Sequence, residues 1–162
     1  MKRLFALAFV AGFAACGSKD HPITSVVTPP DTVVTTTSVV FPNGTITAKI
    51  AATDSARSNG LMNVSTLAAN AGMLFVYGTD HQPFECAYWM QNTPLPLSIA
   101  FIDDSLKVIN VDEMAAETTT FHEPTRACRY VVEANQGWFT AHGVTAGTVV
   151  SFTLPAGTII DP

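Results

Sequence analysis

Two charged side chains stand out because apolar residues surround them in the chain: Arg57 and Glu133. A charge in apolar surroundings must be paired or hydrogen-bonded to be tolerated. In the simpler interpretation, both side chains bind backbone groups or each other and hold the fold. In the alternative interpretation, Arg57, Asn92 and Glu133 converge on a pocket rimmed by Trp89, where they could bind a polar ligand or act on it.

Aromatic side chains could complete such a site. A stacking platform for sugars could be built from Tyr88, Trp89, Trp138 and Phe139. Aromatic residues at strand spacing more often belong to a hydrophobic core. Both interpretations stay open at this point.

Common catalytic and cofactor motifs are absent from the sequence. The histidines His21, His81, His122 and His142 follow no metal-ligand spacing, and no Cys-x-x-Cys pair lies near them. There is no phosphate loop, no dinucleotide fingerprint, no Gly-x-Ser-x-Gly and no His-Glu-x-x-His. We therefore predict no metal and no cofactor, and we favour a non-enzymatic function.

Three cysteines are present: Cys16, Cys86 and Cys128. If Cys16 carries a lipid, the remaining pair in an oxidising compartment suggests a disulfide. Cys86 and Cys128 both fall on the expected inward face of their strands. Two buried free thiols are the alternative, whereas a nucleophilic cysteine would need an activating histidine that no sequence feature supplies.

The N-terminus has the pattern of a targeting segment. Lys2 and Arg3 precede an uncharged apolar run that is too short to span a bilayer, so residues 1–15 are predicted to be a signal peptide. Phe13-Ala14-Ala15-Cys16 resembles a bacterial lipobox, with Phe13 in place of the usual Leu, and predicts lipidation of Cys16. The alternative is an ordinary secretory signal. Gly17, in place of an aspartate, resembles lipoproteins sorted to the outer membrane, which would place the domain in the periplasm.

The charge of the mature chain argues against nucleic acid as a partner. Removing residues 1–15 takes away Lys2 and Arg3 and no acid, so six basic side chains face 13 acidic ones and the net charge goes from −5 to −7. No basic patch is left to bind phosphates or acidic lipid headgroups. The expected partners are the membrane, through the lipid anchor, and an envelope ligand or protein.

Turn and periodicity signals divide the rest of the chain into short elements. Residues 16–40 resemble a Thr/Pro-rich linker, of which 33–40 could add an edge strand, and residues 41–160 form one domain. Strands are predicted at 45–51, 72–76, 84–90, 97–102, 106–111, 128–134 and 148–154, and short helices after Thr53 and within 136–142. In 128–134, Cys128, Tyr130, Val132 and Ala134 are expected to face in, and Arg129, Val131 and Glu133 to face out. The pattern predicts a mainly-β sandwich or barrel with one or two short helices.

Several blocks of the sequence occur in a specific order: Arg57-x-x-Gly60-Leu61-Met62, Gly72-Met73-Leu74-Phe75, Trp89-Met90-x-Asn92-Thr93-x-x-Pro96-Leu97, Phe101-Ile102-Asp103 and Val132-Glu133-x-x-x-Gly137. In these blocks the chain from Thr45 to Phe152 resembles domain-of-unknown-function (DUF) family 192. The resemblance implies a jelly-roll-like β-sandwich and no established activity. Three charges that are common in the family are replaced here, by Val64, Ser98 and Thr148.

Three functions follow as hypotheses. The first is an envelope lipoprotein whose domain is a binding or accessory module for a small molecule, a glycan or another envelope protein. The second is an enzyme that acts on an envelope substrate through Arg57, Asn92 and Glu133. The third is a purely structural domain, in which these residues contribute to stability alone.

Overall fold

The structure is a computed structural model that describes residues 35–79 and 86–161. The predicted signal peptide, the lipidation site Cys16 and the linker up to residue 34 lie outside the described residues. The described chain forms β1 (Thr36–Phe41), β2 (Gly44–Ala51), α1 (Asp54–Asn59), β3 (Ala71–Val76), β4 (Leu97–Ile102), β5 (Val108–Met114), β6 (Tyr130–Asn135) and α2 (Trp138–Ala141). Residues 36–40 therefore belong to the sheet, as the edge-strand interpretation of the linker's end allowed.

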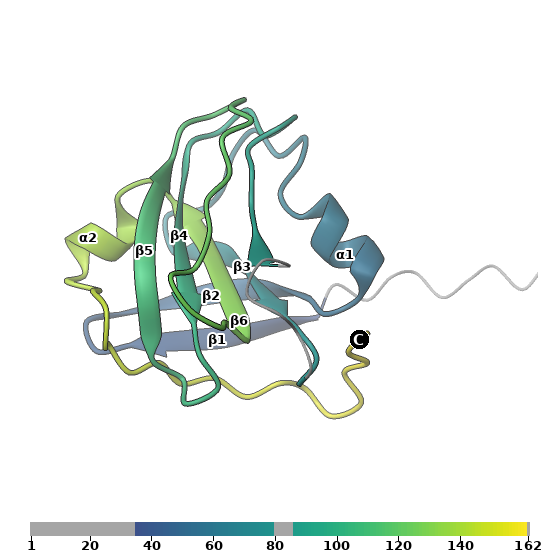
Figure 1. Ribbon diagram of the computed structural model, residues 1–162, viewed down its shortest axis with the longest axis vertical. Helices are drawn as coiled ribbons and strands as arrows, with labels where there is room; N and C mark the ends of the chain where they lie inside the picture. Colours follow the sequence, from purple (N-terminus) through teal and green to yellow (C-terminus); the bar gives the residue numbers. More distant parts are fainter. Residues whose placement is uncertain (1–34, 80–85, 162) are drawn as a thin grey trace, which may run out of the picture. The chain divides into compact units, whose positions relative to one another are not determined.

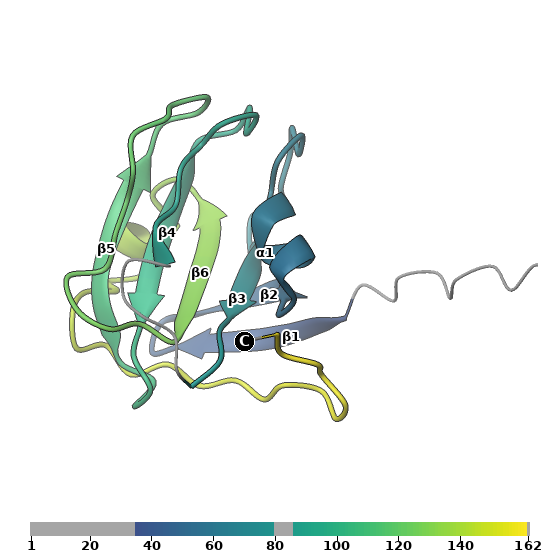
Figure 2. The same cartoon turned by 45° about the vertical axis from the view of Figure 1, so that its right-hand side comes forward.

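The strands make one six-stranded sheet in the order β1-β2-β3-β6-β4-β5. β2 and β3 are parallel neighbours joined by a crossover that contains α1, and the other neighbours are antiparallel. In Figures 1 and 2 β1 runs crosswise to β5, which shows how strongly the sheet twists between its edges. The predicted mainly-β fold with short helices is confirmed, and the sheet is not closed into a barrel.

Both faces of this sheet are covered, so the domain has two hydrophobic cores. One core packs α2 and the C-terminal segment on the sheet through residues that include Phe41, Ile46, Leu74, Val132 and Phe139. The other lies on the opposite face and includes Phe75, Tyr88, Met90, Phe101 and Val131. The prediction that Val131 and Glu133 face out is wrong, because β6 lies in the middle of the sheet and neither of its faces meets open solvent.

The central strands approach each other closely at Gly72. A Cβ atom at this position would lie 2.3 Å from the carbonyl oxygen of Glu133 and 2.8 Å from Cγ2 of Ile46. A side chain larger than a hydrogen would therefore push β3 away from β6. This is the physical reason for a glycine at the start of the Gly72-Met73-Leu74-Phe75 block.

An extended C-terminal segment, residues 147–151, touches both edges of the sheet. Val40 of β1 and Ser151 exchange two backbone hydrogen bonds (2.8 and 3.0 Å), and the Val108 N–H of β5 donates to the Thr148 carbonyl (2.9 Å). The strand predicted at 148–154 is present only as isolated pairings, Val40 with Ser151 and Lys107 with Val149. These pairings cover exposed backbone groups of the edge strands, which would otherwise invite pairing with another chain.

The segment that begins at Cys86 lies over the second core. Its predicted strand is reduced to a single pairing, between Tyr88 and His122, although the alternation holds: Cys86, Tyr88 and Met90 are buried and Trp89 is exposed. The predicted disulfide between Cys86 and Cys128 is present. It ties the start of this segment to the residues that lead into β6.

Removal of the disulfide is expected to destabilise the domain. The bond closes a loop between residues 42 apart, and loss of this restraint on the unfolded chain is worth about 4 kcal/mol in the chain-entropy model. The double variant Cys86→Ala/Cys128→Ala should unfold at a clearly lower denaturant concentration than the oxidised protein, as measured by urea titration. Adding a reductant should shift the wild-type curve and leave the variant unchanged. Superimposable curves for all four samples would contradict this expectation.

Candidate ligand-binding pocket

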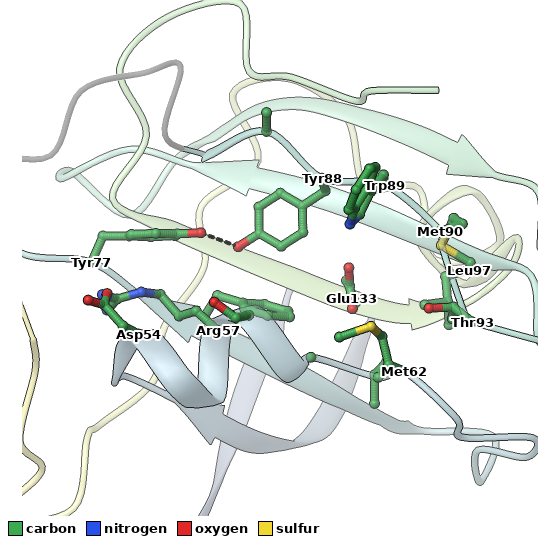
Figure 3. A pocket seen from close by; sticks show the side chains of 15 residues that line it. Asp54, Arg57, Met62, Tyr77, Tyr88, Trp89, Met90, Thr93, Leu97 and Glu133 are labelled. Carbon is green, nitrogen blue, oxygen red and sulfur yellow. Dashed lines mark hydrogen bonds and ion pairs between the residues drawn. The ribbon is translucent and has the colours of Figure 1, made fainter. Parts of the chain in front are cut away.

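A pocket of about 430 Å³ opens on the face of the sheet that carries the second core. Its walls come from α1 and the turn after it, the end of β3, residues 87–93, and the central strand β6 (Figure 3). The side chains that line it are mainly apolar or aromatic, as in most small-molecule sites. The members that matter below are Arg57, Met62, Tyr77, Tyr88, Trp89, Met90, Thr93 and Glu133.

Glu133 supplies the carboxyl group of this pocket. It lies on β6 between Met73 of β3 and Ile99 of β4, and only 4% of the residue is exposed. Figure 3 shows its carboxyl group pointing into the space between Trp89 and Met62. Among the described residues no side chain or backbone group forms a hydrogen bond or an ion pair with this carboxyl. A buried carboxyl group without a protein partner is costly for a fold.

The surroundings of Glu133 change its acidity. Burial disfavours the charged form and raises the pKa of Glu133 to about 8. The carboxyl group therefore changes charge near neutral pH instead of in acid. A group of this kind in a cleft is a typical marker of a functional site.

Two tyrosines on the wall form a hydroxyl pair. The hydroxyl oxygens of Tyr77 and Tyr88 lie 2.7 Å apart, which is hydrogen-bond distance. Burial raises the pKa of both phenols, most strongly for Tyr88, and the charge of Glu133 raises it further. Both hydroxyls are thus neutral across the physiological range. Tyr88 is expected from the sequence only as a stacking residue, and Tyr77 has no sequence signal.

Arg57 lines the pocket but also ties α1 to the ends of β2 and β3 and to Asp161. Its Nη1 donates to the carbonyl oxygens of Ala52 (2.8 Å), Val76 (2.9 Å) and Asp161 (3.4 Å), and its Nη2 pairs with the Asp54 carboxylate. The guanidinium also lies 4.9 Å from the centre of the Tyr77 ring. For Arg57, this matches the interpretation that the charge binds backbone groups and holds the fold.

Asn92 is not among the residues that line the pocket. Its side chain is exposed, and its backbone is left-handed, with φ at 57°. Asparagine tolerates this conformation better than most residues. The Asn92 carbonyl accepts from the N–H of Asn63 at 2.7 Å, so the turn is fastened to the chain after α1. The structure therefore brings Arg57, Trp89 and Glu133 to one pocket and leaves Asn92 in the turn beside it.

Trp89 forms part of the mouth of the pocket. It is 46% exposed and stacks on Phe121, with ring centroids 5.6 Å apart and planes 8° from parallel. Trp138 and Phe139 are buried in the first core, on the other face of the sheet, so they do not join Trp89 in a stacking platform. Phe121 is the residue that stacks with Trp89, although it lies in none of the family blocks.

Ser98 connects three elements away from the pocket. Its hydroxyl donates to Oε2 of Glu113 at 2.7 Å and accepts from the Gly137 N–H at 2.7 Å. The Gly137 N–H lies 3.1 Å from the same carboxylate oxygen. The serine that replaces the family's usual aspartate thus works with the Glu113 carboxylate of β5 to hold the start of α2.

Two further features concern metals and membranes. Within residues 35–79 and 86–161, no group of three or more His, Cys, Asp or Glu side chains could hold a metal ion. No helix in the same part of the chain is long and apolar enough to cross a membrane.

Comparison with known protein families identifies one family. The profile of the DUF192 family, described as an uncharacterised ACR family, matches residues 36–152. A search of curated proteins finds no match. A structure of a protein of unknown function from Novosphingobium aromaticivorans is similar, with 24% identity and a TM-score of 0.64 over 72% of this chain and 83% of that one. A candidate transcription regulator from Sinorhizobium meliloti has 26% identity and a TM-score of 0.63 over 72% of this chain and 92% of that one.

The buried Glu133 predicts that stability depends on pH. Its pKa is about 8 in the folded chain against 4.5 ordinarily, so between these values the unfolded chain has released a proton that the folded chain keeps. The stability is full below the lower pKa and is lost as pH rises through the upper one, at up to about 1.4 kcal/mol per pH unit. Urea unfolding between about pH 5 and pH 9 measures this slope.

A matched pair of variants assigns the slope to this residue. Glu133→Gln should flatten the dependence and be more stable than wild type at alkaline pH, since no buried charge forms. Glu123→Gln removes the same charge from an exposed position and should keep the wild-type slope. Equal slopes in all three proteins would show that the Glu133 carboxyl ionises as it does in water.

Proposed function

We propose a function on the premise that this chain belongs to the DUF192 family, which is uncharacterised, so that the pocket itself must indicate the activity. The function that the geometry supports best is the binding of a small molecule. One observation carries this proposal: a carboxyl group without a partner among the described residues is buried in the wall of an open pocket of about 430 Å³. A ligand would supply the partner that the fold omits.

A purely structural role accounts poorly for this carboxyl group. Buried ionisable groups are often less stabilising than apolar residues of similar size, even when they are paired. Glu133 has no such pairing among the described residues, so an apolar side chain would make a more stable strand at this position. A residue that weakens the fold and faces a cavity is better explained by what the cavity binds.

An enzymatic role through the residues expected from the sequence also has little support. That hypothesis requires Arg57, Asn92 and Glu133 to converge within hydrogen-bond reach of a substrate. Asn92 lies outside the pocket, and Arg57 bonds backbone carbonyls and Asp54. Glu133 could move a proton, but Arg57 in the same pocket is bound to other groups and Asn92 does not line the pocket. Binding therefore accounts for the site with fewer requirements.

The place of action that we propose is the bacterial cell envelope. The lipobox-like Phe13-Ala14-Ala15-Cys16 supports lipidation at Cys16, and the absence of an aspartate after it supports the outer membrane. The disulfide between Cys86 and Cys128 supports an oxidising compartment such as the periplasm. The candidate regulator from Sinorhizobium meliloti suggests DNA as a different partner. We do not extend that role to this chain, because its net charge of −5 opposes binding to phosphates.

Filling the pocket tests the binding function. A panel of neutral sugars, carboxylic acids and amines is titrated into the ¹⁵N-labelled protein, and backbone amide shifts are followed by NMR. At least one class should shift amides of residues that line the pocket. Ala87→Phe, which adds bulk at the pocket wall, should abolish these shifts. Ala141→Phe adds the same bulk at an exposed position of α2, outside the pocket, and should retain them. Shifts that survive in both variants, or a panel without any shift, would contradict a ligand-binding pocket.

Lipidation is tested in cells of a Gram-negative host. The wild-type chain should lose residues 1–15, gain the mass of a diacylglycerol and an acyl chain, and fractionate with the outer membrane. Cys16→Ala should carry no lipid and leave the membrane fraction, while Cys86→Ala keeps Cys16 and should remain lipidated. Mass spectrometry of each fraction decides the outcome, and a soluble, unmodified wild-type protein would contradict the anchor.

A further inference from the structure

We infer that the ligand of this pocket is a small organic cation, whose ammonium group pairs with Glu133 beside the aromatic side chains of Trp89 and Tyr88. The inference rests on the binding function proposed above and names the chemical class of its ligand. It follows from the charges of the wall and from the side chains around the carboxyl group, with which no cation of the described residues forms an ion pair.

The charges of the wall leave a negative group to be matched. Of the described residues, three with charged side chains line the pocket: Asp54, Arg57 and Glu133. Arg57 and Asp54 form an ion pair, so their charges offset each other. Once Glu133 ionises, the wall carries one net negative charge in a site of low dielectric. A cation is the ligand that compensates it, whereas an anion would be repelled.

The side chains around the carboxyl group suit an organic cation better than a small metal ion. Ring faces attract cations, and the Arg57 guanidinium over the Tyr77 ring shows that this wall already holds one. Met62 and Met90 add polarisable thioethers to the same wall. A hard metal ion would need several oxygen ligands around it, and the described residues offer no such cluster. Alkyl groups on an ammonium ion would instead pack against the apolar wall.

Proton release would accompany binding of the cation. The carboxyl group is mostly protonated at neutral pH, since its pKa is about 8. Two other titratable groups that face it are neutral: Tyr77, directly after β3, and Tyr88, in the segment that begins at Cys86. The remaining two are Arg57 and Asp54 of α1, which pair with each other. On β5 Asp112 is opposite Ile99 and pairs with His122 at 2.8 Å. Glu133 is thus the group whose charge follows the ligand, and affinity should rise with pH.

The test compares choline with 3,3-dimethylbutan-1-ol, which has the same shape but a carbon in place of the charged nitrogen. Both are titrated into the full mature chain at about pH 6, 7, 8 and 9 and followed by NMR. Choline should bind at least tenfold more tightly than the alcohol at pH 9, a ratio of about ten being one pKa unit of interaction. Its affinity should fall between pH 8 and pH 6, as Glu133 gains its proton, and approach that of the alcohol; a tenfold preference at pH 9 corresponds to a total fall of about fivefold over this range.

Two variants assign the preference to the carboxyl group. Glu133→Gln keeps the shape of the side chain and should bind choline and the alcohol equally, without the pH dependence. Glu123→Gln should behave as wild type. Unfolding curves of each variant establish that the chain is folded, and Glu133→Gln is expected to be the more stable at alkaline pH.

The remaining outcomes separate this inference from the function on which it rests. Equal affinity for choline and the alcohol in wild type, or choline binding that is strongest at low pH, would overturn the cation and leave a pocket for neutral ligands. The same holds if only sugars or acids of the wider panel shift pocket amides. If no member of the panel shifts any pocket amide, the binding function itself fails, and the cation fails with it.

Discussion

A carboxyl group on the central strand of a sheet that is covered on both faces is the constraint on which the rest of this structure depends. β6 lies between β3 and β4, so Glu133 cannot reach bulk water by a small shift of the backbone. The fold gives it a pocket instead. The crossover through α1 forms one wall, and the segment from Cys86 to Thr93 forms the other. Without the gap between these two walls, the carboxyl group would be enclosed in the core and would have to stay protonated.

The two walls are held by a disulfide that the sequence predicts and by hydrogen bonds whose partners it does not identify. Arg57 fastens α1 to the end of β3 and to Asp161 through three backbone carbonyls. The disulfide at Cys86 and the pairing of Tyr88 with His122 fasten the opposite wall. Asn92, in its left-handed turn, ties that wall to the chain after α1. The three residues of the enzyme hypothesis thus have two different roles. Arg57 and Asn92 belong to the frame that holds the walls, and Glu133 is the binding group.

Much of the fold could be predicted because the signals are local. Alternation of Ile46, Ala48 and Ile50 marks β2, and Thr53 and Gly60 mark the ends of α1. Three members of the pocket, Arg57, Trp89 and Glu133, could be proposed from the sequence. The rest of its wall could not, because residues 54–62, 75–77, 87–97 and 133 meet only through the order of the strands. Alternation predicts the wrong exposure for Val131 and Glu133. It indicates which residues of a strand share a face of the sheet, but it does not indicate whether other elements cover both faces. Phe121, which follows no block, had no signal that could have placed it on Trp89.

The positions where this chain departs from its family bear on the same division between frame and binding group. Val64 packs against the second core, Ser98 joins Glu113 at the start of α2, and the Thr148 hydroxyl accepts from the Thr145 N–H. None of the three is among the described residues that line the pocket. At Ser98 a carboxylate is still close, since Glu113 of the neighbouring strand accepts from the serine hydroxyl, which in turn accepts from the Gly137 N–H. The three departures therefore concern the frame and not the residues that line the pocket. A ligand that pairs with Glu133 does not need the three charges that are replaced here.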